Sequence, residues 1–187
     1  MPGHLIVSDE DATRVIKLRR PEKKNAFTQD MYRGVSDAID TAQNNPNIRC
    51  IIITGGSGVF TAGNDLEDFL KESTSATDTP RGASNAVKLL YSLAHNVKPI
   101  IAAVDGVAIG IGTTMLFHCD YVLASTTATF STPFINLGLV PEGASSLLMP
   151  RTMGYQRAFS MLVMGRKFSA DEAREAGFVN VVVAPGH

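Results

Sequence analysis

Residues 100–150 read IIAAVDGVAIGIGTTMLFHCDYVLASTTATFSTPFINLGLVPEGASSLLMP, and this stretch decides the fold that we expect. It begins with a β-branched and alanine-rich run at residues 100–104, which is typical of a buried strand. A turn with Gly110 and Gly112 follows, and the nearly uncharged residues 113–119 predict a helix buried on almost all sides. Because neither glycine has a side chain, the first amides of that helix are open to whatever lies in front of the turn. Such amides can stabilise an oxygen that becomes negative during a reaction.

Strand and helix patterns alternate on both sides of this stretch. Residues 50–54 (CIIIT) form a continuous apolar run, which predicts a strand with both faces covered. A capping box of Ser169 with Glu172 marks the start of one helix. The alternation predicts an α/β fold with short ββα-like steps. The other expected elements are two strands within residues 5–18, a final strand at 178–183, helices after Thr28 and at 83–94 and 155–164, and a mobile polar segment at 66–80.

Composition places the 187-residue chain among ordinary globular proteins. Hydrophobic residues make up 44% and charged residues 19%, which suits a single domain spanning residues 1–187. The formal net charge of −1 gives no electrostatic basis for binding nucleic acid. Asp105, His118 and Asp120 interrupt the longest apolar stretch, so no membrane span is expected, and no residues show metal-site spacing. The two cysteines, expected to be buried free thiols, and the lack of targeting patterns predict a cytoplasmic location.

Three segments make the sequence resemble the crotonase, or enoyl-CoA hydratase/isomerase, superfamily. They are FTAGNDL at 60–66, PIIAAVDGVAIGIGTTMLFHCDYVLAS at 99–125 and TFSTPFINLGLVPEGASSLLMPRTMG at 129–154. The resemblance extends from the first strands to Val183. It implies a spiral of repeated ββα units, with the C-terminal helical part short or absent here. It also implies an acyl-CoA thioester substrate, no separate cofactor because coenzyme A is part of the substrate, and a homotrimer or a dimer of trimers.

The resemblance also assigns roles to individual residues. The backbone amides of Asn64 and Ile111 correspond to the two donors of the family's oxyanion hole. Proton removal beside a thioester carbonyl makes an enolate, and each aimed amide stabilises its oxygen by roughly 3–4 kcal/mol. Glu142 matches the single catalytic Glu of Δ3,Δ2-enoyl-CoA isomerases. Contacts to the substrate or to coenzyme A are expected from Lys24, Ala62, Gly63, Asp65, Gly110 and Phe134.

The carboxylates of the motif favour one reaction. Hydratases that resemble this chain have glutamates at the positions of Thr114 and Phe134, and neither residue can transfer a proton as a carboxyl does. We therefore expect an isomerase of fatty acid β-oxidation, in which Glu142 moves a proton from C2 to C4 of a 3-enoyl-CoA to give trans-2-enoyl-CoA. Apolar neighbours should raise the pKa of Glu142, and a place in a first helical turn should lower it.

Other interpretations stay open from the sequence alone. The chain could run hydratase-like or other enolate chemistry on acyl-CoA, or be a non-catalytic acyl-CoA-binding subunit. Glu142 after Pro141 could be only a helix-dipole partner, and Gly110 with Gly112 could only permit tight packing. Basic loop residues such as Lys24 are often merely solvated.

Overall fold

The computed structural model describes residues 3–56, 58–68 and 84–185. Its strands form a six-stranded sheet in the order β1-β2-β3-β5-β7-β10 and a four-stranded sheet in the order β4-β6-β8-β9. β1 pairs antiparallel with β2, and every later neighbour in the larger sheet is parallel. The strands are β1 (Leu5–Glu10), β2 (Thr13–Leu18), β3 (Cys50–Thr54), β4 (Val59–Thr61), β5 (Ile100–Val104), β6 (Val107–Ile109), β7 (Tyr121–Ser125), β8 (Thr129–Ser131), β9 (Phe168–Ser169) and β10 (Val181–Val183).

From β3 to β8, consecutive strands alternate between the two sheets, which makes this part of the chain a spiral. The pairs β3-β4, β5-β6 and β7-β8 each place their first strand in the larger sheet and their second in the smaller one. Each new turn lies parallel to the one before it, with Ile52 opposite Ile101 and Ala103 opposite Leu123. The predicted α/β class and the repeated ββα units are therefore confirmed.

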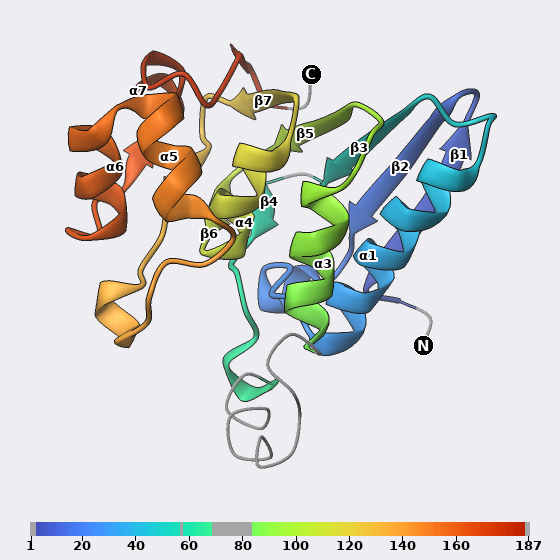
Figure 1. The fold of residues 1–187 in the computed structure, drawn as a ribbon, viewed down its shortest axis with the longest axis horizontal. Coiled ribbons are helices and arrows are strands. Elements are labelled where there is room, and N and C mark those ends of the chain that lie inside the picture. Colours follow the sequence, from blue (N-terminus) through green and yellow to red (C-terminus); the bar gives the residue numbers. More distant parts are fainter. Residues whose placement is uncertain (1–2, 57, 69–83, 186–187) are drawn as a thin grey trace.

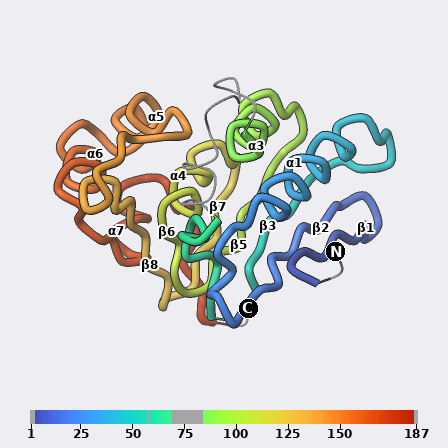
Figure 2. Tube along the Cα trace, turned by 90° about the horizontal axis from the view of Figure 1, so that it is seen from below, coloured from blue at the N-terminus to red at the C-terminus, as the bar shows by residue number. Residues whose placement is uncertain are grey.

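Apart from α4, which lies between them, the described α-helices fall into two groups, as Figures 1 and 2 show. α1 and α3 lie side by side over the larger sheet, where the hydroxyls of Ser36 and Ser92 are 2.7 Å apart. α5, α6 and α7 gather at the other end of the molecule. The helices are α1 (Gln29–Asn44), α3 (Asn85–Ala94), α4 (Ile111–Thr114), α5 (Ser145–Met153), α6 (Tyr155–Leu162) and α7 (Ala170–Glu175), with 3₁₀ turns η1 (Pro21–Lys23), η2 (Met115–His118) and η3 (Ile135–Leu137).

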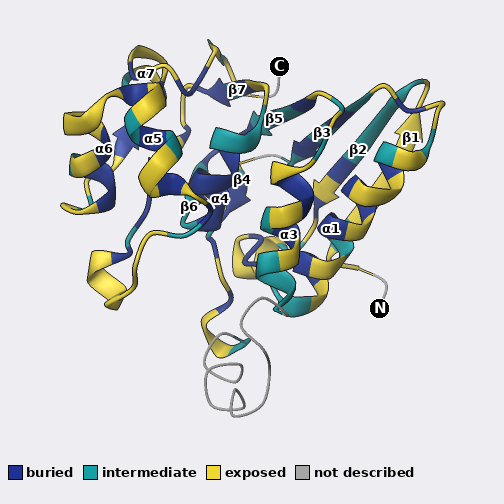
Figure 3. Cartoon of the chain, viewed as in Figure 1, coloured by how far each residue is buried: buried dark blue, intermediate teal, exposed yellow. Residues whose placement is uncertain are grey.

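The longest described helix, α1, forms for the reasons that its sequence predicts. The Thr28 hydroxyl accepts the N–H of Met31 and caps the first turn. Val35, Ile39 and Ala42 then recur at helical spacing and are fully buried. Figure 3 shows the result as a buried face toward the sheet and an exposed face toward solvent. No helix in the described ranges is both long and apolar enough to cross a bilayer.

Several expected elements differ from those observed. In β3, Ile51 and Ile53 are fully buried but Ile52 is only half-buried, so the second face of the strand is incompletely covered. The strand expected at 178–183 is limited to β10, because the amides of Phe178 and Val179 bond to the Ala173 carbonyl, each at 3.3 Å, and not to a neighbouring strand. Most of the segment expected to be mobile, residues 69–80, lies outside the described residues.

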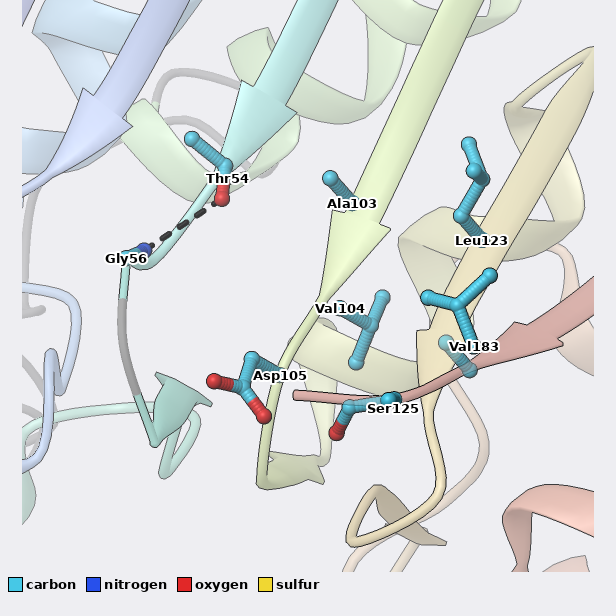
Figure 4. A pocket seen from close by; sticks show the side chains of 10 residues that line it. Thr54, Gly56, Ala103, Val104, Asp105, Leu123, Ser125 and Val183 are labelled. Atoms are coloured by element: carbon cyan, nitrogen blue, oxygen red, sulfur yellow. Dashed lines mark hydrogen bonds between the residues drawn. The ribbon is translucent and has the colours of Figure 1, made fainter. Parts of the chain in front are cut away.

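Asp105 ties successive turns of the spiral together at the β5–β6 corner. Its Oδ2 accepts the N–H of Gly58 at 2.7 Å, and its Oδ1 accepts the Thr127 hydroxyl at 3.3 Å. Gly106 follows with φ +70°, and a Cβ there would lie 1.9 Å from the carbonyl oxygen of Gly58, so only glycine lets the corners stack. Figure 4 shows Asp105 and Ser125 beside a cavity of about 150 Å³ at these corners. Because the carboxylate oxygens already have partners, we assign Asp105 a structural role.

Candidate active site

A second cavity of about 760 Å³ contains most of the residues that the sequence analysis selected. It lies between the 62–67 segment, α3, the start of α4, and the 133–142 segment. Its walls are mainly apolar, which is typical of pockets that bind small organic ligands. The lining residues that the sequence analysis named are Ala62, Gly63, Asn64, Asp65, Gly110, Ile111, Phe134 and Glu142.

The Asn64 amide is the first free donor at this cavity. Residues on both sides of it bond to Phe27, which donates its N–H to the Gly63 carbonyl at 2.7 Å and accepts the N–H of Asp65 at 2.9 Å. This parallel bridge leaves the N–H of Asn64 without an acceptor in the described part of the chain. The side-chain oxygen of Asn64 accepts the Tyr32 hydroxyl, which holds the residue in place.

The Ile111 amide is the second free donor. Gly110 precedes it with φ +57° and ψ −119°, a conformation that favours glycine, and is the N-cap of α4. The carbonyl of Gly110 accepts the amides of Thr113 and Thr114, both at 2.9 Å, whereas the N–H of Ile111 has no acceptor among the described residues. The sequence predicted a helix at 113–119. The helix instead begins at Ile111, immediately after the glycine, and continues as the 3₁₀ turn η2.

Glycines bring these two donor segments together. A Cβ on Gly63 would lie 2.8 Å from the Ile109 carbonyl oxygen and 3.8 Å from the Gly110 nitrogen. A Cβ on Gly112 would lie 2.4 Å from the γ-methyl of Thr61. The absence of both side chains thus lets the 61–64 segment lie directly against the start of α4, so that two unpaired amides line one cavity.

Glu142 supplies a carboxyl to the same cavity. It is half-buried, and its Oε1 accepts the hydroxyl of Thr114 at 2.5 Å. Burial raises the pKa of Glu142 above its ordinary value, and the Thr114 hydrogen bond opposes that shift without reversing it. The expected place in a first helical turn is wrong: Gly143 and Ala144 have φ of +63° and +53°, so α5 begins only at Ser145. The helix-start effect that we expected to lower the pKa is therefore absent.

Three carboxylates line the cavity among the described residues, and Glu142 differs from the other two in its environment. Asp65 pairs with Arg20 at 2.6 Å, and the exposed Glu67 pairs with Lys23 at 3.5 Å. Glu142 has no cationic partner within the described residues. A half-buried carboxyl with a raised pKa and no counter-ion among the described residues is suited to taking and returning a proton.

The Arg20–Asp65 pair holds the segment that follows Asn64. The side chains are 12% and 7% exposed, and Arg20 also donates to the Ala26 carbonyl. Asp65 Oδ1 accepts the amides of Glu67 and Asp68, and the Arg20 guanidinium holds the pKa of the Asp65 carboxyl below its ordinary value. Asp65 was expected to contact substrate. It lines the cavity, but its carboxylate is engaged with Arg20 and these two amides.

Replacing Asp65 by Asn should therefore destabilise the fold, because it leaves the Arg20 charge buried without its partner. We expect the free energy of unfolding to fall by about 3–5 kcal/mol at pH 7, measured by urea denaturation. Since the folded-state pKa of Asp65 is lowered, the difference from the parent should shrink as the pH falls below about 4. The control Asp9→Asn breaks the pair with Arg14, in which the carboxylate is 39% exposed and Arg14 keeps hydrogen bonds to the Ala38 carbonyl and the Thr41 hydroxyl. It should cost at most about 1 kcal/mol. Equal losses for the two variants would contradict this assignment.

Other expected residues lie in different places. Lys24 is exposed, in a left-handed conformation at the end of η1, and its neighbour Lys23 lines the cavity instead.

Sequence reasoning gave no functional role to His118, whose Nε2 lies 2.8 Å from the Gly143 carbonyl oxygen. Both cysteines are free and half-buried, and burial raises the pKa of Cys119 to about 12. Among the described residues, no three His, Cys, Asp or Glu side chains are grouped to hold a metal ion.

A family model described as enoyl-CoA hydratase/isomerase matches residues 9–186. The chain belongs to this enoyl-CoA hydratase/isomerase family. It is 38% identical to "Enoyl-CoA delta isomerase 2" of Homo sapiens, over 95% of this chain and 45% of that protein. It is 34% identical to "1,2-epoxyphenylacetyl-CoA isomerase" of Escherichia coli K12, over 93% of this chain and 67% of that protein. Further relatives are named as a dehalogenase and an enoyl-CoA hydratase.

A solved member of the enoyl-CoA hydratase/isomerase family confirms the fold. The structure from Pseudoalteromonas atlantica T6c matches with a TM-score of 0.90 and 38% identity, covering 97% of this chain and 70% of that chain. The predicted resemblance to the crotonase superfamily and its spiral of ββα units is thereby confirmed. The chain spans less than half of the human relative, at 45% of its length.

Proposed function

We propose that this chain isomerises 3-enoyl-CoA thioesters to trans-2-enoyl-CoA, with Glu142 as the only acid/base group. The observation that supports this most directly is Glu142 itself, a carboxyl with a raised pKa and no cationic partner among the described residues, in the cavity that also receives the free amides of Asn64 and Ile111. Relatives named as delta isomerases favour the same reaction, although relatives with other names exist in the family.

The proposed steps use only this chain's own groups. The thioester carbonyl oxygen accepts hydrogen bonds from the backbone amides of Asn64 and Ile111. The Glu142 carboxylate then removes a proton from C2. The electrons of the broken C–H bond spread over a dienolate, whose oxygen becomes negative in front of the two donors. The protonated Glu142 then gives its proton to C4, the C2=C3 bond forms, and the carboxylate is restored. One carboxyl suffices because the proton that it takes from C2 is the one that it returns to C4.

Hydration needs an activated water as well as a proton donor, and the two positions at which the resembling hydratases have glutamates hold Thr114 and Phe134 here. Thr114 is fully buried and its hydroxyl is directed to Glu142. Phe134 is 6% exposed and contributes an aromatic wall. Together with Leu137, Leu139 and Val140, it makes this side of the cavity apolar and suited to an acyl chain.

Several aspects of the function follow as parts of the same proposal. Coenzyme A would be bound as part of the substrate, with Lys23 at the cavity and Lys24 beside it as candidate phosphate contacts. Ala62, Gly63 and Gly110 would allow close backbone approach to the thioester. We treat residues 1–187 as one acyl-CoA-binding domain. Assembly as a homotrimer or a dimer of trimers, a cytoplasmic location and a place in β-oxidation stay predictions.

The reaction is tested with trans-3-enoyl-CoA and trans-2-enoyl-CoA as separate substrates. We expect the 187-residue chain to convert the first to the conjugated product, followed by ultraviolet absorbance, and to hydrate the second at no more than about 1% of that rate. Among the described residues, the other two carboxylates of the cavity, Asp65 and Glu67, are paired with cations and are not expected to activate water. Efficient hydration would overturn the one-base mechanism. Binding of acyl-CoA without turnover of either substrate would favour a non-catalytic binding role.

A further inference from the structure

Glu142 is held by the same helical segment that presents the Ile111 amide. Within residues 111–118, Ile111 lines the cavity, Thr114 donates to Glu142 Oε1 at 2.5 Å, and His118 Nε2 lies 2.8 Å from the carbonyl oxygen of Gly143. Since that carbonyl can only accept, Nε2 must be the protonated nitrogen. Two side chains from one helical segment thus fix the 142–143 backbone and carboxyl relative to the proposed oxyanion donor.

The contact between Thr114 and the 142–143 segment is close on the backbone side as well. A Cβ on Gly143 would lie 3.3 Å from Thr114 Oγ1 and 3.4 Å from Thr114 Cβ, and Gly143 has φ +63°. Any side chain at Gly143 would be strained and would press on Thr114. Glycine therefore lets the segment approach closely enough for the hydrogen bond from the Thr114 hydroxyl.

This hydrogen bond makes the two carboxyl oxygens of Glu142 unequal. Oε1 is occupied by Thr114, whereas Oε2 has no hydrogen-bond partner among the described residues. A threonine hydroxyl in a helix often bonds to the carbonyl four residues earlier. Here that carbonyl, of Gly110, is occupied by the amides of Thr113 and Thr114, and the fully buried hydroxyl is directed to Glu142.

We propose that Thr114 is a positioning residue that occupies Glu142 Oε1 and so assigns Oε2 the transfer of the proton between C2 and C4. This inference rests on the proposed isomerase function. Thr114 occupies the position at which the resembling hydratases have a glutamate. It therefore places no second carboxyl in the site, and its hydroxyl orients the carboxyl of Glu142. The hydrogen bond from Thr114 lowers the pKa of Glu142 and so opposes the increase that burial causes, as expected for a donor to the charged carboxylate.

The test compares Thr114→Val, which removes the hydroxyl at similar volume, with Thr114→Ser, which keeps a donor. We expect Thr114→Val to lower kcat for isomerisation about 10- to 100-fold, with KM changed by no more than about twofold, because an unheld base loses its alignment with the substrate. The acid limb of the pH profile should move to higher pH, since a hydrogen bond to the charged carboxylate is lost. Thr114→Ser should stay within about threefold of the parent in kcat.

Thr113→Val is the matched control. Thr113 is adjacent and equally buried, but its hydroxyl donates to the carbonyls of Ala108 and Ser131. We expect it to lower the unfolding free energy without moving the acid limb. The other described ionisable groups that line the cavity or contact the 142–143 segment are the same in all variants; they are Lys23, Tyr32, Asp65, Glu67 and His118. If valine at 114 prevents folding, Thr114→Ala replaces it in the comparison.

The proposal would be overturned if Thr114→Val had the same kcat and pH profile as the parent. It would also be overturned if Thr114→Ser lost as much activity as Thr114→Val. A second readout separates this failure from failure of the proposed function. The unfolding free energy at pH 7 is measured for Thr114→Val alone and in the Glu142→Gln background. We expect a larger loss in the first case, because only there is a half-buried charged carboxylate left without its donor. This result does not depend on turnover, so an inactive parent with a clear coupling would refute the isomerase function and keep the Thr114 contact.

Discussion

Glu142→Gln is expected to lower kcat for conversion of trans-3-enoyl-CoA to trans-2-enoyl-CoA by about 100- to 10,000-fold, the range over which a positioned acid/base group contributes. The amide cannot accept the C2 proton at neutral pH. It keeps the shape of the carboxyl and can still accept the Thr114 hydroxyl, so the cavity and the affinity for acyl-CoA should be preserved. Steady-state kinetics and a direct binding measurement check the two parts separately.

The matched control is Glu10→Gln, the same chemical change at an exposed position at the end of β1. We expect its kcat to equal that of the parent within error. If Glu142→Gln keeps most of the parent activity, the proton must be carried by another group, and the one-base mechanism is wrong.

The raised pKa of Glu142 gives the same prediction a pH dependence. Activity of the parent should be lost as the pH falls through the folded-state pKa of Glu142, at a pH above the ordinary value for glutamate. The ionisation of Glu142 changes the stability of the fold with pH in the direction opposite to that of Asp65. Between the unfolded and the raised folded pKa, the native state binds more protons, so stability falls as the pH rises. Glu142→Gln should remove this slope and be at least as stable as the parent at pH 7.

The sequence allowed much of the site to be predicted, because its decisive features are local. Gly110 before Ile111 and Gly63 before Asn64 mark positions where the backbone must turn or approach closely, and such requirements are visible in the residue itself. Glu142 was selected by its motif. The strand and helix order followed from alternation of apolar runs and from caps such as Thr28.

What the sequence did not predict depends on contacts between distant segments. Thr114 bonds to Glu142 across 28 positions, and Arg20 pairs with Asp65 across 45 positions, so no local pattern indicates either partner. We expected the start of a helix to lower the pKa of Glu142, but α5 begins only after Ala144. Ala144 has a left-handed conformation, which alanine rarely adopts and which its sequence therefore does not predict.

Ile111→Pro is expected to lower kcat by about 100- to 1,000-fold, the loss seen when one oxyanion donor is removed. Proline lacks the N–H that we propose to stabilise the dienolate oxygen. The backbone should tolerate it, because Ile111 is the first residue of α4, where proline is favoured, and Gly110 before it has no Cβ to clash with the ring. The N–H that is removed has no acceptor among the described residues, so no hydrogen bond within that part of the chain is lost with it.

Ile111→Ala is the control that distinguishes loss of the backbone N–H from loss of the isoleucine side chain. Ile111 is 5% exposed, so both substitutions lose apolar contacts, and alanine loses at least as many as proline. Alanine keeps the N–H, and we expect its kcat to stay within about tenfold of the parent, well above the proline variant. Thermal unfolding of both variants shows whether either loses the fold. An active Ile111→Pro would mean that the thioester oxygen is stabilised elsewhere, whereas equal losses for alanine and proline would assign the effect to packing. A loss confined to proline, at comparable stability, would identify the amide as the donor.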